Sequence, residues 1–235
     1  MMRKPFRFKQ FEIFQDQTAM KVGTDGVLLG AWANLYHGKQ ILDIGSGTGL
    51  ISLMLAQRFS EALIDAVELD ESAYQQTKEN FLNSKFEARL TITQIPIQSF
   101  ISPTKYDLIV SNPPFFVNNE RVDLDARKAA RQQETLTFED LLAKTKDLLA
   151  AQGVASFIIP FDLEENFLAI AKNLTLYPKR IVHVKGNEEA PIKRSLIELS
   201  FNAKDVTYSS LVIEIGRHQY TDDYIRLTKE FYLKM

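Results

Sequence analysis

Apolar and polar positions follow two different periods along the chain. Short unbroken apolar runs predict buried strands, and five of these are expected at 40–44, 63–69, 89–95, 106–111 and 153–159. Segments with helical spacing separate them, which predicts helices at 49–58, 71–83, 137–151 and 162–173. Unbroken runs such as 107–110 suit a parallel sheet covered on both faces. The pattern therefore predicts an α/β fold of the Rossmann-like, doubly wound kind.

The remaining segments extend this picture at both ends. Three closing strands are expected at 180–185, 195–201 and 206–215, one of them antiparallel to a mostly parallel sheet, and a last helix from Asp222. Near the N-terminus, Phe6 and Phe8 predict a strand, and a helix capped by Thr24 or Asp25 runs to about Asn34. No linker or repeat divides the chain. We therefore expect one domain over 1–235, with an arm and lid helix in 1–36 and the core in 37–235.

Composition limits the chemistry that this fold can carry. At 235 residues with 45% hydrophobic content, the chain suits one globular domain. It has no cysteine, which excludes disulfides, thiolate metal sites and a catalytic thiol. The three histidines lie far apart without ligand spacing, so no metal is expected. The net charge of -2 argues against coating nucleic acid by charge alone, and the lack of a long apolar stretch predicts a cytoplasmic protein with no membrane contact.

Three alternate glycines follow the expected strand at 40–44 and come directly before a helix. Glycine lets the backbone turn sharply and approach a ligand, and the helix N-terminus then offers amide donors. Glu68 ends the next expected strand, where its carboxylate could accept both ribose hydroxyls of a nucleoside. Asp70 is expected to cap the helix that follows. Together these features favour a nucleoside cofactor, and a tight turn with no ligand is the alternative.

Two details favour S-adenosylmethionine over NAD. The dinucleotide fingerprint has its third glycine three residues after the second, whereas Gly49 follows Gly47 by only two. Asp43 also places a carboxylate before the loop, which suits a ligand with an α-ammonium group. The cofactor residues expected in this region are Asp43, Gly45, Gly47, Gly49, Glu68 and Leu69.

A second motif, Asn112-Pro113-Pro114-Phe115, ends the expected strand at 106–111. An exocyclic amino group is a poor nucleophile because its lone pair is delocalised into the ring. The Asn112 side-chain oxygen and the Pro113 carbonyl could accept its two hydrogens and turn the lone pair toward a sulfonium methyl. Phe115 offers a face on which a flipped base can stack. An ordinary strand-ending turn is the other interpretation, although the nearby glycine loop favours catalysis.

This pair of motifs resembles the amino methyltransferases, which act on adenine, guanine or glutamine amide nitrogen. A narrower resemblance covers most of the chain: Phe8-Lys9-Gln10-Phe11, residues 19–33 and residues 136–141 are similar to the tRNA(Val) adenine methyltransferases. That resemblance implies S-adenosylmethionine-dependent methylation of the N6 amino group of an adenosine beside the anticodon of tRNA(Val). It also implies that further residues line the cofactor end of the site, under a lid helix: Lys21, Thr24, Asp25 and Gly26.

The chain departs from related enzymes at one point. Where they commonly have an acidic residue near the cofactor adenine, this chain has Pro96, so Ile97 and Gln98 are the expected contacts, with Asn112 near the reacting methyl group. Protein glutamine N5 or RNA guanine N2 methylation uses the same loop chemistry and remains open, as does a non-catalytic RNA-binding factor that keeps the fold. The glutamine-modifying family usually carries Tyr after the two prolines, whereas this chain has Phe115.

Basic side chains near the site could contact phosphate groups of a tRNA partner. Each of them could equally belong to a solvated face. Residues 116–135 form a long polar segment that suits either a lid that orders on RNA binding or an exposed loop without a function. The chain is expected to act as a monomer. The expected RNA-binding residues are Arg3, Lys4, Arg7, Lys9, Arg131, Lys193 and Arg194.

Overall fold

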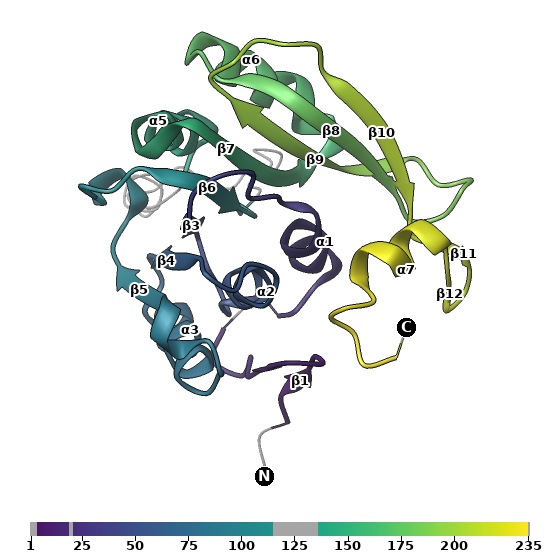
Figure 1. Cartoon of the computed structure of the whole chain (residues 1–235). Coiled ribbons are helices and arrows are strands. Elements are labelled where there is room, and N and C mark those ends of the chain that lie inside the picture. The colour runs from purple at the N-terminus through teal and green to yellow at the C-terminus, as the bar shows by residue number, and fades with distance from the viewer. Residues whose placement is uncertain (1–3, 19–20, 115–135, 235) are drawn as a thin grey trace, which may run out of the picture.

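The computed structural model describes residues 4–18, 21–114 and 136–234. Within these residues, one sheet holds eight strands in the order β10-β8-β9-β7-β6-β3-β4-β5 (Figure 1). The strands are β3 (Gln40–Ile44), β4 (Leu63–Glu68), β5 (Leu90–Gln94), β6 (Tyr106–Ser111), β7 (Leu149–Pro160), β8 (Tyr177–Lys185), β9 (Ile192–Ser200) and β10 (Thr207–Val212). The order reverses between β3 and β6, which is where ligands bind in doubly wound sheets.

The sheet is parallel except around β9. This strand pairs antiparallel with β7 on one side and β8 on the other, while β10 pairs parallel with β8. The predicted fold class, a mostly parallel sheet with an antiparallel closing strand, is thus confirmed. The antiparallel strand lies inside the sheet, and β10 forms its edge.

Helices cover both faces of the sheet (Figure 1). α1 (Thr24–Trp32), α2 (Leu50–Arg58), α3 (Glu71–Leu82) and α7 (Asp222–Thr228) lie on one face, and α5 (Phe138–Leu148) and α6 (Glu164–Asn173) on the other. Two separate apolar clusters fill the layers between helices and sheet. Burial on both faces explains why the core strands read as unbroken apolar runs.

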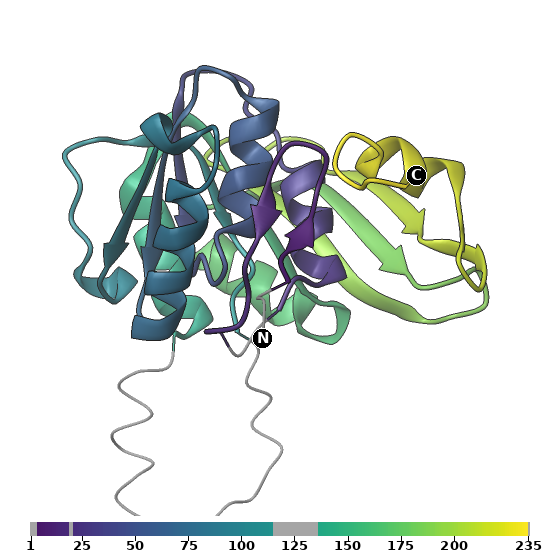
Figure 2. The same cartoon turned by 90° about the horizontal axis from the view of Figure 1, so that it is seen from below.

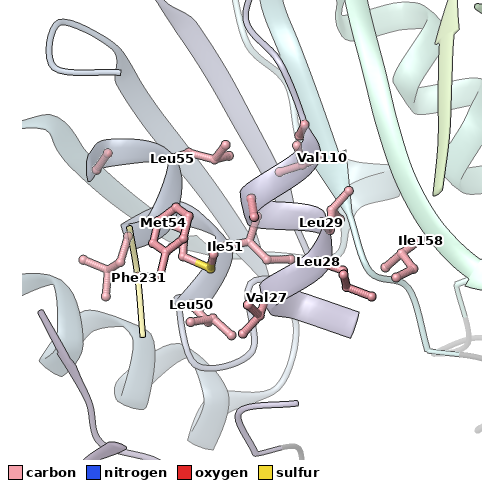
Figure 3. Packing of buried hydrophobic residues seen from close by; sticks show 14 of the residues in the cluster. Val27, Leu28, Leu29, Leu50, Ile51, Met54, Leu55, Val110, Ile158 and Phe231 are labelled. Carbon is pink, nitrogen blue, oxygen red and sulfur yellow. The ribbon is translucent and has the colours of Figure 1, made fainter. Parts of the chain in front are cut away.

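α1 belongs to the core of the protein. Its residues from Gly26 to Ala31 are buried, and Figure 3 shows its side chains packed between those of α2 and those of the sheet, among them Val27, Ile51 and Val110. The prediction that Thr24 or Asp25 caps this helix is wrong, because the N-cap is Gly23 and makes no side-chain cap bond. The helix also ends at Trp32, two residues earlier than predicted. α1, the helix expected to act as a lid over the cofactor, is therefore packed into the core.

The N-terminal arm is docked against the body of the protein. It forms a short antiparallel ribbon of β1 (Phe6–Arg7) and β2 (Glu12–Ile13), seen beside the helices in Figure 2. Phe8 and Phe11 are buried in the α1 and α2 cluster, and their rings stack with centroids 4.8 Å apart. The Lys9 amide donates to the Phe231 carbonyl at 2.8 Å, and Phe8 forms an isolated bridge with Tyr232. The two ends of the described chain are thus held together.

Several element boundaries differ from the predictions for local reasons. Residues 149–151, expected in a helix, begin β7 because Leu149 pairs with Tyr106 in the sheet. β8 begins at Tyr177 and includes Pro178, which a bulge accommodates beside Arg180. The strand expected at 206–215 is divided into β10 and a hairpin of β11 (Glu214–Gly216) and β12 (Gln219–Tyr220).

Candidate active site

The two sequence motifs meet at the carboxyl ends of neighbouring strands. Ile44, the last residue of β3, is the register partner of Ser111, the last residue of β6. The buried Ser111 hydroxyl also donates to the Ile44 carbonyl at 2.8 Å. The glycine loop begins at Gly45 and the Asn-Pro-Pro loop at Asn112, so both start from strands about 5 Å apart. The predicted cofactor and catalytic motifs therefore adjoin each other.

The glycine loop has the backbone that its sequence suggested. Gly45, Gly47 and Gly49 have φ values of 75°, 60° and 77°, a region that favours glycine. A Cβ at Gly45 or Gly47 would meet nothing within 4 Å, whereas one at Gly49 would lie 2.7 Å from the Phe81 ring. The first two glycines thus border open space that a ligand can enter, and the third lets α2 pack against α3.

Glu68 connects the glycine loop to the end of β4. One carboxylate oxygen accepts the Gly47 amide at 2.8 Å, and the other accepts the amides of Leu69 and Asp70 at 2.8 and 3.0 Å. Leu69 beside it is 44% exposed. The Asp70 side chain accepts the Ala73 amide at 2.8 Å, which confirms the predicted cap of α3. An acceptor next to an exposed apolar side chain suits a nucleoside, which offers ribose hydroxyls next to a flat base.

Asp43 lies behind the loop and is completely buried. Its Oδ2 accepts the Ser52 amide at 3.2 Å and the Ser52 hydroxyl at 2.6 Å, which holds the first turns of α2 against β3. Its Oδ1 is buried and has no hydrogen-bond partner among the described residues. Burial raises the pKa of this carboxyl to about 6, against hydrogen bonds from Ser52 that lower it. Oδ1 is therefore the one atom of Asp43 left for a cationic ligand.

Polar side chains of α3 hold the loop from outside, and sequence reasoning missed them. The Thr77 hydroxyl donates to the Gly47 carbonyl at 2.9 Å. The Asn80 amide donates to the carbonyls of Thr48 and Phe14, both at 2.8 Å, and its Oδ1 accepts the Phe14 amide. The available signal was that Gln76, Thr77 and Asn80 are polar on the helix face that should be apolar. These side chains are wholly buried.

The segment before α1 approaches the cofactor end of the site. Gly26 is buried, and a Cβ there would lie 3.1 Å from the Leu50 side chain at the start of α2. Lys21 and Thr24 are exposed. Asp25 forms an ion pair with Arg194 of β9, with Nε to Oδ2 at 2.7 Å. This part of the predicted cofactor set thus lies beside the glycine loop, and one member is committed to a side-chain partner.

The residues expected near the cofactor adenine occupy a short 3-10 turn, η2 (Ile97–Ser99), after β5. Ile97 is buried in the cluster that also contains Val67. Gln98 is exposed, and its amide donates to Asp140 of α5 at 3.2 Å. In this structure, Gln98 is thus engaged with α5 and not with the glycine loop.

The catalytic loop continues directly from β6. Asn112 is partly buried, Pro113 is buried and Pro114 is exposed. Phe115 and the expected lid at 116–135 lie outside the described residues. Asn112 stays accessible beside the loop start at Gly45, which is the placement that a catalytic side chain needs.

The predicted RNA-binding cations have different surroundings. Arg7 pairs with Glu12 at 2.9 Å, the Lys9 ammonium donates to the Lys229 carbonyl at 2.6 Å, and Arg194 pairs with Asp25. Lys4 and Lys193 are exposed. Arg3 and Arg131 lie outside the described residues. The arm cations therefore also serve the docking of the arm, which sequence reasoning did not foresee.

The described residues fit an S-adenosylmethionine molecule. They offer open space at two glycines, a carboxylate at the end of β4, an exposed apolar side chain and a buried carboxylate oxygen without a partner. No group of three or more potential metal ligands was found in the part of the chain that the structure describes. In the same part, no helix is long and apolar enough to cross a membrane.

Comparisons with known proteins agree with this site. The family described as Methyltransferase small domain matches residues 17–161. Among solved structures, a predicted O-methyltransferase from Agrobacterium tumefaciens matches with a TM-score of 0.71 at 17% identity, over 88% of this chain and 96% of that one. A Pyrococcus horikoshii protein in complex with MeSAdo matches with a TM-score of 0.55 at 16% identity, over 80% of this chain and 67% of that one. At this identity, such similarity shows the class I methyltransferase fold alone.

Similarity in sequence is much higher to a set of curated bacterial proteins. A protein of Flavobacterium johnsoniae is 50% identical over 98% of this chain and 100% of its own length, and one of Christiangramia forsetii is 46% identical over the full length of both. One of Parabacteroides distasonis is 45% identical over 98% of both chains. All three are named tRNA1(Val) (adenine(37)-N6)-methyltransferase. With this identity over the full length, and with the glycine and Asn-Pro-Pro loops in place, the chain belongs to the tRNA1(Val) (adenine(37)-N6)-methyltransferase family of S-adenosylmethionine-dependent enzymes.

Proposed function

We propose that this protein transfers the methyl group of S-adenosylmethionine to the N6 amino group of adenosine 37 in tRNA1(Val). The observation that carries the proposal is the pairing of Ile44 with Ser111, which places Asn112 beside the glycine loop. A planar amino nitrogen held at Asn112 therefore lies next to the cofactor site. The names of the full-length relatives supply the base and the tRNA.

The catalytic loop activates the nitrogen by accepting its hydrogens. The Asn112 side-chain oxygen and the Pro113 carbonyl each accept one hydrogen of the amino group, which favours a pyramidal nitrogen with a directed lone pair. When bound, S-adenosylmethionine supplies an electrophilic methyl group on a sulfonium. The methylated nitrogen then releases one proton to water. Asn112 acts only as a neutral hydrogen-bond acceptor. Much of the rate then comes from holding the amino nitrogen in line with the methyl group.

The cofactor residues bind and orient. In our proposal, Glu68 accepts the ribose hydroxyls, Leu69 packs against the adenine with Ile97 beneath it, and the N-terminus of α2 faces the carboxylate end. Asp43 Oδ1 and the Lys21–Gly26 segment border the amino-acid end of the cofactor. Glu68 Oε2 accepts one bond, from the Gly47 amide, and so retains a lone pair for a ribose hydroxyl.

The alternatives with the same loop chemistry have less support. The glutamine-modifying family usually carries Tyr after the two prolines, whereas this chain has Phe115. The relatives over the whole chain are named for adenine, not guanine. Action as a monomer and in the cytoplasm remains part of the proposal.

The test is transfer of labelled methyl from S-adenosylmethionine by the purified protein to total tRNA and, separately, to total protein. Digested tRNA should contain label in N6-methyladenosine, and a tRNA1(Val) transcript with guanosine at position 37 should accept none. Label in methylguanosine or methylglutamine would overturn the substrate assignment. Transfer to neither fraction would overturn the activity.

A further inference from the structure

Three aromatic side chains form a continuous strip on the face of the sheet that α6 covers. Phe161 begins the 3-10 turn η3 (Phe161–Leu163), His183 lies in β8 and Tyr208 in β10. The Phe161 ring meets the His183 ring edge-on with centroids 5.1 Å apart, and the His183 and Tyr208 rings are 6.2 Å apart. We call these three residues the aromatic strip.

The strip starts at the edge of the sheet where the candidate active site lies. Ser111, which precedes Asn112, is the register partner of Phe157 in β7. β7 continues in the same direction to Pro160, about 10 Å beyond the end of β6, and Phe161 follows it. Pro160 is the register partner of Arg194, whose ion pair with Asp25 borders the cofactor end. The strip thus leads away from the catalytic loop across the closing strands.

Hydrogen bonds fix the middle ring of the strip. Nε2 of His183 lies 2.9 Å from a carboxylate oxygen of Glu164, the first residue of α6. The buried Ser195 hydroxyl donates to the same oxygen. None of these groups is needed for methyl transfer at Asn112. A histidine held in one orientation between two exposed rings indicates a prepared surface.

Exposure and charge indicate what this surface contacts. Phe161 is 38% exposed and Tyr208 is 60% exposed, and with His183 between them they form a contiguous aromatic surface, which carries more weight than rings exposed singly. Lys193 is exposed two residues before Ser195, at the bulge where the register between β9 and β8 shifts. Asp162 of η3 and Glu165 of α6 are also exposed, next in sequence to Phe161 and Glu164. Exposed rings with one cation nearby suit bases that stack while a phosphate lies toward Lys193.

We propose that the aromatic strip binds unpaired nucleotides that flank the methylated base in the RNA substrate. Every base has a face that stacks on an aromatic ring, and such surfaces are typical of proteins that bind single-stranded RNA. The continuity of the strip with the catalytic edge argues for the same RNA molecule as occupant. This inference rests on the proposed function, because it assumes that RNA is the substrate.

The test compares Phe161→Ala and Tyr208→Ala with the unchanged protein in two assays. Fluorescence anisotropy measures affinity for a labelled stem-loop RNA with adenosine in its unpaired loop, and steady-state kinetics measure KM for tRNA and for S-adenosylmethionine. Each variant should bind the stem-loop roughly tenfold more weakly. KM for S-adenosylmethionine should not change. Tyr208→Phe, which keeps the ring, should retain most of the affinity.

Matched controls separate stacking from other effects. Leu82→Ala removes an apolar side chain of similar exposure at the far end of α3 and should leave RNA affinity unchanged. Lys193→Ala should weaken binding at low salt but much less at high salt, whereas the loss in Tyr208→Ala should persist. Circular dichroism of each variant verifies that it is folded.

Two results would overturn the inference. Stem-loop affinities within twofold of the unchanged protein for both alanine variants would remove the strip from RNA binding. A change of molar mass in light scattering on Tyr208→Ala, with RNA affinity kept, would make the strip a contact between copies of the chain. Failure of the proposed function looks different, because the unchanged protein would then not methylate tRNA at all.

Discussion

The cofactor side and the closing-strand side of this protein are built from different kinds of contact. On the cofactor side, Glu68 accepts the amide of Gly47, 21 residues away, and Thr77 donates to the carbonyl of the same glycine, 30 residues away. On the closing-strand side, Arg194 pairs with Asp25 across 169 residues. The first side is thus held by bonds between side chains and the backbone of one stretch of chain, and the second by side chains that are far apart in the sequence.

A buried ion cluster shows how far the closing-strand side relies on side chains. Glu198 of β9 is completely buried and accepts two bonds from Arg180, at 3.1 and 2.7 Å, and one from the Tyr36 hydroxyl at 3.1 Å. The Arg180 guanidinium also lies 4.4 Å from the Trp32 ring. Removing the partner of a buried carboxylate costs several kcal/mol. Because Trp32 belongs to α1 while Arg180 and Glu198 belong to β8 and β9, the cluster stabilises the packing of α1 against the closing strands. The sequence alone offers no sign of this pairing.

The largest expected effect separates chemistry from cofactor binding. Asn112→Ala removes one of two acceptors for the amino hydrogens, and kcat should fall about a thousandfold, as for the loss of a positioned transition-state partner. Affinity for S-adenosylmethionine, measured by calorimetry, should stay within a few fold, because Glu68 and the glycine loop are untouched. Unchanged turnover would contradict the proposed mechanism.

The next effect tests the cofactor side alone. Glu68→Ala removes the acceptor of three backbone amides and the proposed ribose ligand. Affinity for S-adenosylmethionine should fall about a hundredfold, while the affinity of the ligand-free protein for stem-loop RNA should not change. Glu68→Gln, which keeps one acceptor oxygen, should lose less. Equal calorimetric affinities for all three proteins would remove Glu68 from the site.

A smaller effect concerns the charge of Asp43. Its pKa is raised to about 6 in the folded protein from 3.8, so its contribution to stability is present below about pH 4 and is lost as pH rises through 6. Two pKa units correspond to roughly 3 kcal/mol, and relaxation around the group should reduce this to about 2 kcal/mol. Denaturant unfolding of the ligand-free protein should show this loss between pH 4 and 7.5, and Asp43→Asn should lack it. Parallel pH profiles for both proteins would contradict it.

The smallest effect joins the two sides. Asp25 and Arg194 are partly exposed, so their ion pair should contribute only about 1 kcal/mol. Asp25→Asn and Arg194→Gln should each raise KM for S-adenosylmethionine a few fold, and the double variant should be no worse than either one. Additive effects in this cycle would show that the two residues act separately on the cofactor end.

The two sides also differ in how well the sequence predicts them. Glycines with positive φ and the cap at Asp70 follow from local rules, and the strands of the core were predicted to within a few residues. The docking of the arm, the buried Glu198 and the partner of Arg194 depend on which distant residues meet. The strand predicted at 180–185 begins three residues earlier, at Tyr177, and only the pairing with β9 shows the bulge that accommodates Pro178.

The contacts between the N-terminal arm and the end of the described chain have a consequence for biosynthesis. Phe8 and Phe11 leave the ribosome early, but the residues that cover them, Phe231 and Tyr232, are added about 220 positions later. A domain generally folds as a unit, so these two aromatic residues stay exposed until the end of the chain has been made. The basic residues around them give this exposed N-terminal segment a positive charge. Charge of one sign on a nascent segment opposes self-association. Arg7 and Lys9 therefore contribute during synthesis, independently of any contact with RNA.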